Sequence, residues 1–210
     1  IISAIDRKIE EQKLNITPKV IAVSKTFKLE KILPLINYGH LDFGENKVQE
    51  AIDKWTDIKI GKPSIRLHLI GNLQTNKVKF ALKIFDYIHS VDSEKLAKKI
   101  ADEELKQNKK VNIFIQVNIG NEEQKSGINK NQINDFYNYC KKLNLNIMGL
   151  MCIPPVDGNP DKYFKELNLL NQNLNLKDLS MGMSSDYLNA AQNASTYLRI
   201  GSGIFGKRDY

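Results

Sequence analysis

Short apolar runs alternate with longer amphipathic stretches along the whole chain. The first apolar run, residues 19–25 (KVIAVSK), is short and rich in β-branched side chains, which is typical of a buried strand. The stretch before it, residues 1–13, places Ile2, Ile5 and Ile9 at helical spacing, so it is predicted to be an amphipathic helix. Strand-like and helix-like segments then follow one another to the end of the sequence.

This alternation predicts eight units of a strand and a helix. Strands, some running into a turn, are expected over residues 19–25, 41–46, 66–71, 87–92, 111–119, 146–153, 179–183 and 196–206. Helices are expected over residues 1–13, 28–37, 46–55, 74–83, 94–107, 130–143, 160–173 and 185–193. Strands that alternate with helices form parallel sheets, and eight such units favour a closed (β/α)8 barrel of the TIM type, an α/β fold. An open doubly wound sheet is disfavoured because no G-x-G-x-x-G follows the first strand.

The chain of 210 residues has the length of a single barrel, and no linker rich in Pro, Gly or Ser divides it. Residues 1–210 are therefore predicted to form one domain. No apolar run approaches the roughly 20 residues that span a bilayer, and the charged start does not have the pattern of a signal peptide. Cys140 and Cys152 have neither metal-site nor disulfide spacing, so we expect reduced thiols and a cytoplasmic protein.

The net charge of +7 comes mostly from lysines that are scattered along the chain, as on a solvated surface. The sequence lacks the basic blocks with interleaved aromatic residues that a nucleic-acid binder shows, which argues against that class of function. Arginine is rare, so an arginine within a motif stands out. The four are Arg7, Arg66, Arg199 and Arg208.

Lys25 ends the first apolar strand, where a charged amine must be solvated or paired. One interpretation is a lysine that reaches past the strand end into water. The other is an amine with a lowered pKa, which attacks an aldehyde and forms a Schiff base. The position alone leaves both interpretations open.

Two loops late in the sequence have the character of an anion site. Ser184, in SMGMSSD, stands before a helix, where it either caps the helix or helps its N–H groups bind an anion. Residues 199–206 (RIGSGIFG) are rich in glycine, which suits a tight turn or close approach to a ligand. Such barrels bind phosphate after strands seven and eight, and strand eight closes onto strand one. A phosphate at Gly201 and Ser202 would lie beside Lys25, which describes a pyridoxal phosphate site.

Arg199 lies two residues before Gly201, on the same face of its strand. It is a surface arginine, or one paired with a carboxylate, or a donor to the pyridine nitrogen of such a cofactor. A cation at that nitrogen resists its protonation and weakens the ring as an electron sink. His68 and His89 lie within strands without the spacing of a zinc site, so we expect satisfied core or rim histidines.

Seven ordered motifs carry a resemblance to a known family. They are VIAVSK with Lys25, FGENKVQE (43–50), HLIGNLQTNK (68–77), QVNIGNEEQKSG (116–127), GLMCIPP (149–155), LSMGMSSD (179–186) and RIGSGIFGKRDY (199–210). Over nearly its whole length the chain closely resembles the YggS family of pyridoxal phosphate homeostasis proteins. It departs at Phe27-Lys28 (usually Lys-Pro), Asn72 (usually Pro) and Ser202-Gly203 (usually Thr-Ala). Ser202 keeps the hydroxyl, so the expected phosphate binding stands.

The resemblance implies a fold like the N-terminal barrel of alanine racemase, with pyridoxal 5'-phosphate held as a Schiff base on Lys25. It implies that Arg199 faces the ring nitrogen and that Asn46 lies near the ring. The residues implied at the phosphate are Ser184, Gly201 and Ser202. Members of the family look like regulators or carriers of the vitamin B6 pool, without robust enzymatic turnover.

Two functions fit these expectations: a cofactor-holding homeostasis protein, and a pyridoxal phosphate-dependent amino-acid racemase or decarboxylase of low activity. Alanine racemase adds a β-rich second domain that supplies a catalytic tyrosine across a dimer interface. Because this chain reaches Tyr210 directly after its eighth strand, we expect no second acid or base opposite Lys25 and favour homeostasis. The expected partners are the cofactor and apo-enzymes that accept it. The chain is expected to be a monomer that binds neither nucleic acid nor membrane.

Overall fold

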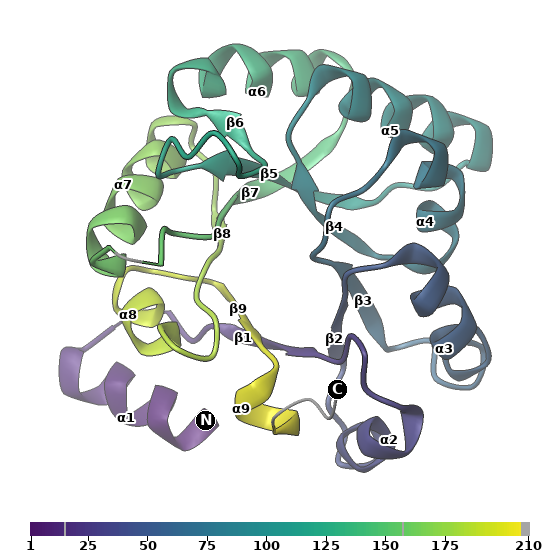
Figure 1. Ribbon diagram of the computed structural model, residues 1–210, viewed down its shortest axis with the longest axis horizontal. Coiled ribbons are helices and arrows are strands. Elements are labelled where there is room, and N and C mark those ends of the chain that lie inside the picture. The colour runs from purple at the N-terminus through teal and green to yellow at the C-terminus, as the bar shows by residue number, and fades with distance from the viewer. Residues whose placement is uncertain (15, 157, 207–210) are drawn as a thin grey trace.

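A closed ring of parallel strands forms the centre of the molecule (Figure 1). The computed structural model describes residues 1–14, 16–156 and 158–206. In these residues eight strands follow the order β4-β3-β2-β1-β9-β8-β7-β5, and β5 pairs back onto β4. They are β1 (Lys19–Val23), β2 (Asp42–Glu45), β3 (Arg66–Leu69), β4 (Tyr87–Val91), β5 (Asn112–Asn118), β7 (Asn146–Cys152), β8 (Asp178–Ser180) and β9 (Tyr197–Ile200). The predicted (β/α)8 barrel is confirmed.

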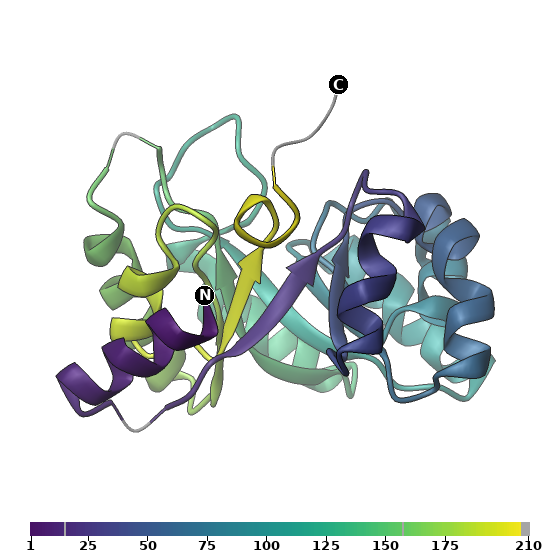
Figure 2. The ribbon, with the colours of Figure 1, turned by 90° about the horizontal axis from the view of Figure 1, so that it is seen from below.

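Helices surround the ring of strands (Figures 1 and 2). They are α1 (Ile2–Gln12), α2 (Leu29–Asn37), α3 (Val48–Gly61), α4 (Val78–Ile84), α5 (Glu94–Gln107), α6 (Ile133–Lys142), α7 (Pro160–Asn173), α8 (Tyr187–Gln192) and α9 (Ser202–Phe205), with short 3-10 turns η1 (Thr75–Lys77) and η2 (Lys130–Gln132). That residues 1–210 form one domain stays a prediction, and residues 207–210 lie outside the described part of the chain.

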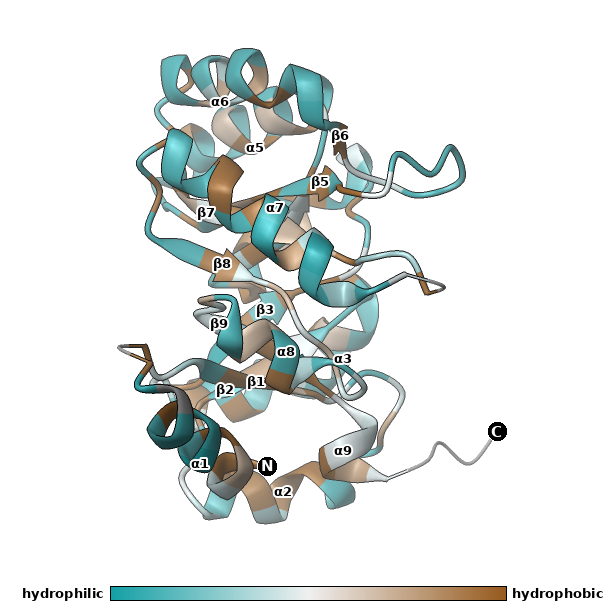
Figure 3. Ribbon diagram, turned by 90° about the vertical axis from the view of Figure 1, so that its left-hand side faces the viewer, coloured by the Kyte–Doolittle hydropathy of each residue, from teal (hydrophilic) through white to brown (hydrophobic). Residues whose placement is uncertain are grey.

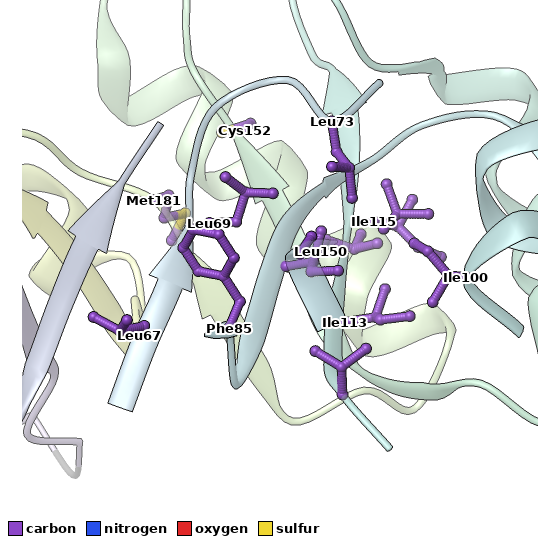
Figure 4. Packing of buried hydrophobic residues seen from close by; sticks show 14 of the residues in the cluster. Leu67, Leu69, Leu73, Phe85, Ile100, Ile113, Ile115, Leu150, Cys152 and Met181 are labelled. Carbon is purple, nitrogen blue, oxygen red and sulfur yellow. The ribbon is translucent and has the colours of Figure 1, made fainter. Parts of the chain in front are cut away.

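Apolar side chains fill the layer between the strands and the helices. In α3, Val48, Ala51 and Trp55 recur at helical spacing and are buried. Trp55 packs against Phe43 of β2, with 4.8 Å between the ring centroids. Figure 4 shows the same kind of packing around Phe85, and Figure 3 shows α6 largely hydrophilic on its outward side. Each large apolar side chain buried here stabilises the fold by roughly 1.5–3 kcal/mol.

A second, smaller cluster lies inside the barrel. It contains Ile21, Phe114, Met151 and Tyr197, which come from β1, β5, β7 and β9. Phe114 and Tyr197 are on strands that do not pair, yet their ring centroids are 5.4 Å apart. The two rings therefore meet across the barrel axis.

The structure differs from the predicted elements in a few places. A two-residue strand, β6 (Ile128–Asn129), pairs with the end of β5 at a position for which the sequence predicted no element, because so short a strand has no periodicity to detect. Residues 196–206, predicted to be a strand and a turn, form a strand that ends at Ile200 and then the short helix α9 in place of the turn. Of the two residues that the sequence offers as a cap for α5, Ser93 and Asp92, Ser93 stands at the N-cap, and its side chain makes no capping hydrogen bond.

Two other sequence expectations concern the buried thiols and the membrane. Cys140 and Cys152 are free and buried, and this burial raises the pKa of each thiol to about 12. Neither is therefore a reactive thiolate at neutral pH. Across the described parts of the chain, none of the helices combines the length and the apolar character that a bilayer crossing requires.

Candidate cofactor site

A cavity of about 670 Å³ lies at the carboxyl ends of the barrel strands. In Figure 2 the arrows of β1 and β9 point toward this rim, where α9 lies. The six site residues predicted from the sequence all line it: Lys25, Asn46, Ser184, Arg199, Gly201 and Ser202. Because β9 pairs with β1, with Ala22 opposite Ile200, the first and the last of these six residues in the sequence, Lys25 and Ser202, lie at the same end of neighbouring strands. The structure thus gathers these residues at one site, while the role of each stays a prediction.

The turn that carries Lys25 has a strained backbone. Thr26 has a φ of 68°, which is rare for a β-branched residue. Such strain costs on the order of 1–3 kcal/mol and persists only where the surroundings hold it. The Thr26 N–H donates to Glu50 Oε1 at 2.6 Å, and the Ser24 N–H donates to Gly44 O at 2.9 Å. Both sides of Lys25 are therefore tied to the neighbouring β2–α3 segment.

A buried ion-pair network supports this turn from below. Glu45 is fully buried, and its Oε1 accepts from Ser24 Oγ at 2.7 Å, Lys54 Nζ at 2.9 Å and Trp55 Nε1 at 2.9 Å. Lys54 Nζ also donates to Ser24 O at 3.0 Å and pairs with Glu50. Sequence reasoning missed this network, although Glu50 and Lys54 at i,i+4 spacing in a predicted helix were a usable signal.

One wall of the cavity holds an unsatisfied acceptor. Asn46 Oδ1 is buried and has no hydrogen-bond partner within the described residues. Buried acceptors are normally paired, so this oxygen fits a donor supplied by a ligand or a bound water. Gly71 packs against the Asn46 backbone, where an added Cβ would lie 2.4 Å from the Asn46 carbonyl oxygen. Glycine at position 71 is therefore required for this wall to form.

The loops after β8 and β9 meet at the other end of the cavity. Ser184 Oγ accepts from the Gly203 N–H at 3.3 Å, which ties the two loops together. The prediction that Ser184 stands at a helix N-cap is wrong, because Asp186 occupies that position in α8 and accepts from Met183 N at 2.6 Å. Gly201 has an ordinary φ of −110°. An added Cβ there would make only ordinary van der Waals contact with Val23, at 3.5 Å, so neither the backbone nor the neighbouring side chains require glycine at this position.

Arg199 forms part of the cavity floor and is only 4% exposed. Its Nη1 donates to Ser180 Oγ at 2.8 Å, and its Nη2 donates to Cys152 O at 2.8 Å. The structure thus contradicts the two alternatives of a surface arginine and a carboxylate-paired one, since within the described residues no carboxylate lies at ion-pair distance. Burial lowers the pKa of Arg199, but a guanidinium keeps its proton at neutral pH. The cavity floor therefore carries a positive charge, and among the described residues the carboxylate that acts on it, Asp186, does so without forming an ion pair.

The two strand histidines are satisfied core residues, as predicted. His68 Nε2 lies 3.0 Å from Asp42 Oδ1, and His68 Nδ1 lies 3.0 Å from His89 Nε2. His89 Nδ1 lies 2.8 Å from Ser180 Oγ. Among the residues that the structure describes, no group of three or more His, Cys, Asp or Glu side chains is arranged to hold a metal ion.

We expect the protein to lose stability as the pH falls below about 6.5. Burial lowers the pKa of His68 below its ordinary 6.5 and lowers the pKa of His89 well below it. Below that pH the unfolded chain binds protons that the native chain refuses, so acid favours unfolding. Urea unfolding at pH values of about 7.5 and 5.5, both above the ordinary pKa range of carboxyl groups, measures the effect. An unfolding midpoint that stays constant or rises on acidification would contradict it.

Comparison with known proteins places the fold among pyridoxal phosphate-related barrels. The family model for the N-terminal domain of alanine racemase matches residues 2–209. The pyridoxal phosphate homeostasis protein of Aquifex aeolicus is 38% identical over 202 residues, covering 91% of this chain and 88% of the relative. The protein of that name from Escherichia coli K12 is 34% identical over 201 residues, covering 91% and 86%.

Solved structures extend this likeness. PipY of Synechococcus elongatus, determined with pyridoxal phosphate bound, aligns with a TM-score of 0.84 at 30% identity, covering 96% of this chain and 100% of PipY. An alanine racemase from Clostridium difficile aligns with a TM-score of 0.73 at 13% identity, covering 100% of this chain and 56% of the racemase. At that identity the racemase shares the fold alone.

Proposed function

The chain belongs to the family of pyridoxal phosphate homeostasis proteins, built on the barrel of the alanine racemase N-terminal domain, and we propose that it binds pyridoxal 5'-phosphate and holds it for other proteins. One observation carries this proposal. Lys25, the Arg199 cation and the loops after β8 and β9 all line one cavity of about 670 Å³. An amine, a ring-nitrogen donor and a phosphate cradle are the three groups that this cofactor needs.

Each residue at the site has a proposed role. The Lys25 amine condenses with the cofactor aldehyde, with loss of water, and so holds the cofactor as a Schiff base. The Arg199 guanidinium donates to the ring nitrogen, and Asn46 lies beside the ring. The phosphate is bound by Ser184, Gly201 and Ser202. The Asn46 Oδ1, which lacks a partner among the described residues, suits a hydrogen-bond donor on the ligand, and the buried Arg199 cation suits an anionic ligand. Both features support this arrangement.

The same geometry favours storage over catalysis. A bound cofactor withdraws electrons from its substrate most strongly when its ring nitrogen is protonated. Arg199 keeps its proton and is held by Ser180 and the Cys152 carbonyl, so it opposes a second positive charge at that nitrogen. We therefore propose a cytoplasmic monomer that passes its cofactor to apo-enzymes and has no dedicated amino-acid substrate.

We expect the loaded protein to reactivate an apo-enzyme that requires pyridoxal phosphate, and to show no rapid turnover of free amino acids. Ordinary enzymes turn over about 1–1,000 times per second. The loaded protein is incubated with L-amino acids, and D-isomers, keto acids and amines are measured. In parallel, the recovery of apo-enzyme activity is timed against an equal amount of free cofactor. Turnover in the ordinary range on any common amino acid would establish an enzyme instead.

A further inference from the structure

A line of hydrogen-bonded side chains crosses the barrel interior beneath the cavity. We call it the cross-barrel network, and its members are Arg199, Ser180, His89, His68, Asp42 and Arg66. They come from β9, β8, β4, β3 and β2. His89 and Ser180 lie on strands that do not pair, so their contact at 2.8 Å spans the barrel. The network connects the cavity floor with the opposite, amino-terminal end of the strands, where Arg66 is half-exposed.

The two ends of the network fix its direction. Arg199 has only donors, so Ser180 Oγ accepts from it and has its own proton left for another acceptor. At the far end, Arg66 Nε and Nη2 donate to the two oxygens of Asp42 at 2.7 and 2.6 Å. This bidentate pair keeps Asp42 ionised, so Asp42 accepts from its neighbour His68.

The histidine tautomers follow from these ends. His68 carries its proton on Nε2, facing Asp42, which leaves Nδ1 as an acceptor. His89 must then carry its proton on Nε2, facing His68, which leaves its Nδ1 to accept from the Ser180 hydroxyl. Every bond between Arg199 and Asp42 thus has its donor on the Arg199 side, and both histidines are neutral. The reverse order would place a histidine lone pair against the Asp42 carboxylate.

We propose that Ser180, His89 and His68 are positioning residues for Arg199, a role that depends on the proposed cofactor site. The Ser180 hydroxyl cannot rotate away, because its proton is committed to His89. Its lone pairs therefore stay directed at the guanidinium. The anchoring carboxylate, Asp42, is separated from Arg199 by three neutral side chains and is itself paired with Arg66. The network thereby orients the Arg199 cation without neutralising it, as an adjacent carboxylate would.

The first test is made on the wild-type protein without cofactor. Nitrogen NMR of histidine side chains distinguishes protonation at Nδ1 from protonation at Nε2, and His40, which lies outside the network, serves as the reference resonance. We expect His68 and His89 both as neutral Nε2–H tautomers at neutral pH. An Nδ1–H tautomer or a charged ring at either position overturns the proposal. This result is independent of whether the protein binds pyridoxal phosphate.

The second test uses matched serine variants and added pyridoxal phosphate. Ser180 and Ser195 are both fully buried, but the Ser195 hydroxyl donates only to backbone carbonyls. S180A should weaken binding by roughly twofold to tenfold, less than the loss of Arg199 itself, because the guanidinium remains and loses one of its two acceptors. It should also shift the absorbance of the bound cofactor in the direction that R199A does. S180T, which restores the hydroxyl, should recover both properties.

The outcomes separate the two proposals. If S180A binds and absorbs like S195A while the wild type binds normally, the positioning role is wrong and the proposed function stands. If the wild type binds no pyridoxal phosphate, the proposed function fails. If S180A does not fold, S180T is compared with the wild type instead. A shift of the S180T spectrum toward that of R199A, although the hydroxyl is present, would count against the hydroxyl as the positioning group.

Discussion

Replacing Lys25 with alanine is expected to abolish covalent attachment of pyridoxal phosphate and to leave weak, reversible binding. Among the described residues that line the cavity, Lys25 is the one lysine. A Schiff base needs a primary amine, whereas Arg199 and the loops after β8 and β9 would remain in K25A to hold the ring and the phosphate. Borohydride reduction of the loaded protein, followed by peptide mapping, measures the attachment.

The control for this experiment is K28A. Lys28 lies three residues further along, is exposed, and makes no side-chain capping bond to α2. After borohydride reduction, the K28A variant should carry the label on Lys25, as the wild type does. A reduced adduct on any other lysine, or an adduct that persists in K25A, would remove Lys25 from the proposed site.

Replacing Arg199 with alanine is expected to weaken cofactor binding by roughly 10- to 150-fold and to shift the absorbance of the bound cofactor. A hydrogen bond to a charged group contributes about 1.5–3 kcal/mol, which corresponds to that range. The loss also leaves Ser180 Oγ and the Cys152 carbonyl without their donor. A fluorescence titration and an absorbance spectrum on the same samples give the two readouts.

Two further variants make the Arg199 result specific. R7A removes an exposed arginine from α1 and should bind like the wild type. R199K keeps a positive charge but lacks the fork that reaches both Ser180 and Cys152, so it should fall between wild type and R199A. Unchanged affinity and spectrum in R199A, with the fold intact, would mean that Arg199 serves the barrel rather than the cofactor.

The barrel was accessible from sequence because local patterns encode it, and the strand-end pattern also indicated most of the cavity residues, whereas Asn46 was predicted through the family resemblance. Strand ends in a parallel barrel share one rim, so reading the residue after each apolar run already places Lys25 and Ser202 on the same side. The supporting contacts were not accessible in this way. His89 and Ser180 are 91 residues apart, and nothing in the neighbourhood of either indicates that they touch across the barrel.

The sequence prediction was also wrong where two neighbouring residues both suit the same structural position. Ser184 and Asp186 both suit an N-cap, and only the path of the loop after β8 decides that Asp186 takes it. The Glu45 network is a similar case. Its acidic residue reads as an ordinary strand end, and its burial emerges only when α3 folds Lys54 and Trp55 over it.

The closure of β9 onto β1 has a consequence for biosynthesis. Lys19 is paired with Tyr197, so β1 lacks a neighbour on that side until the chain as far as Tyr197 has left the ribosome. Lys25 and Arg199 come together only at that moment, and the long loop closed by this pairing makes it a late and slow step. A nascent chain is therefore not expected to bind free pyridoxal phosphate. The proposed cofactor would bind only the finished barrel, and by mass action it would favour the closed ring over an opened one.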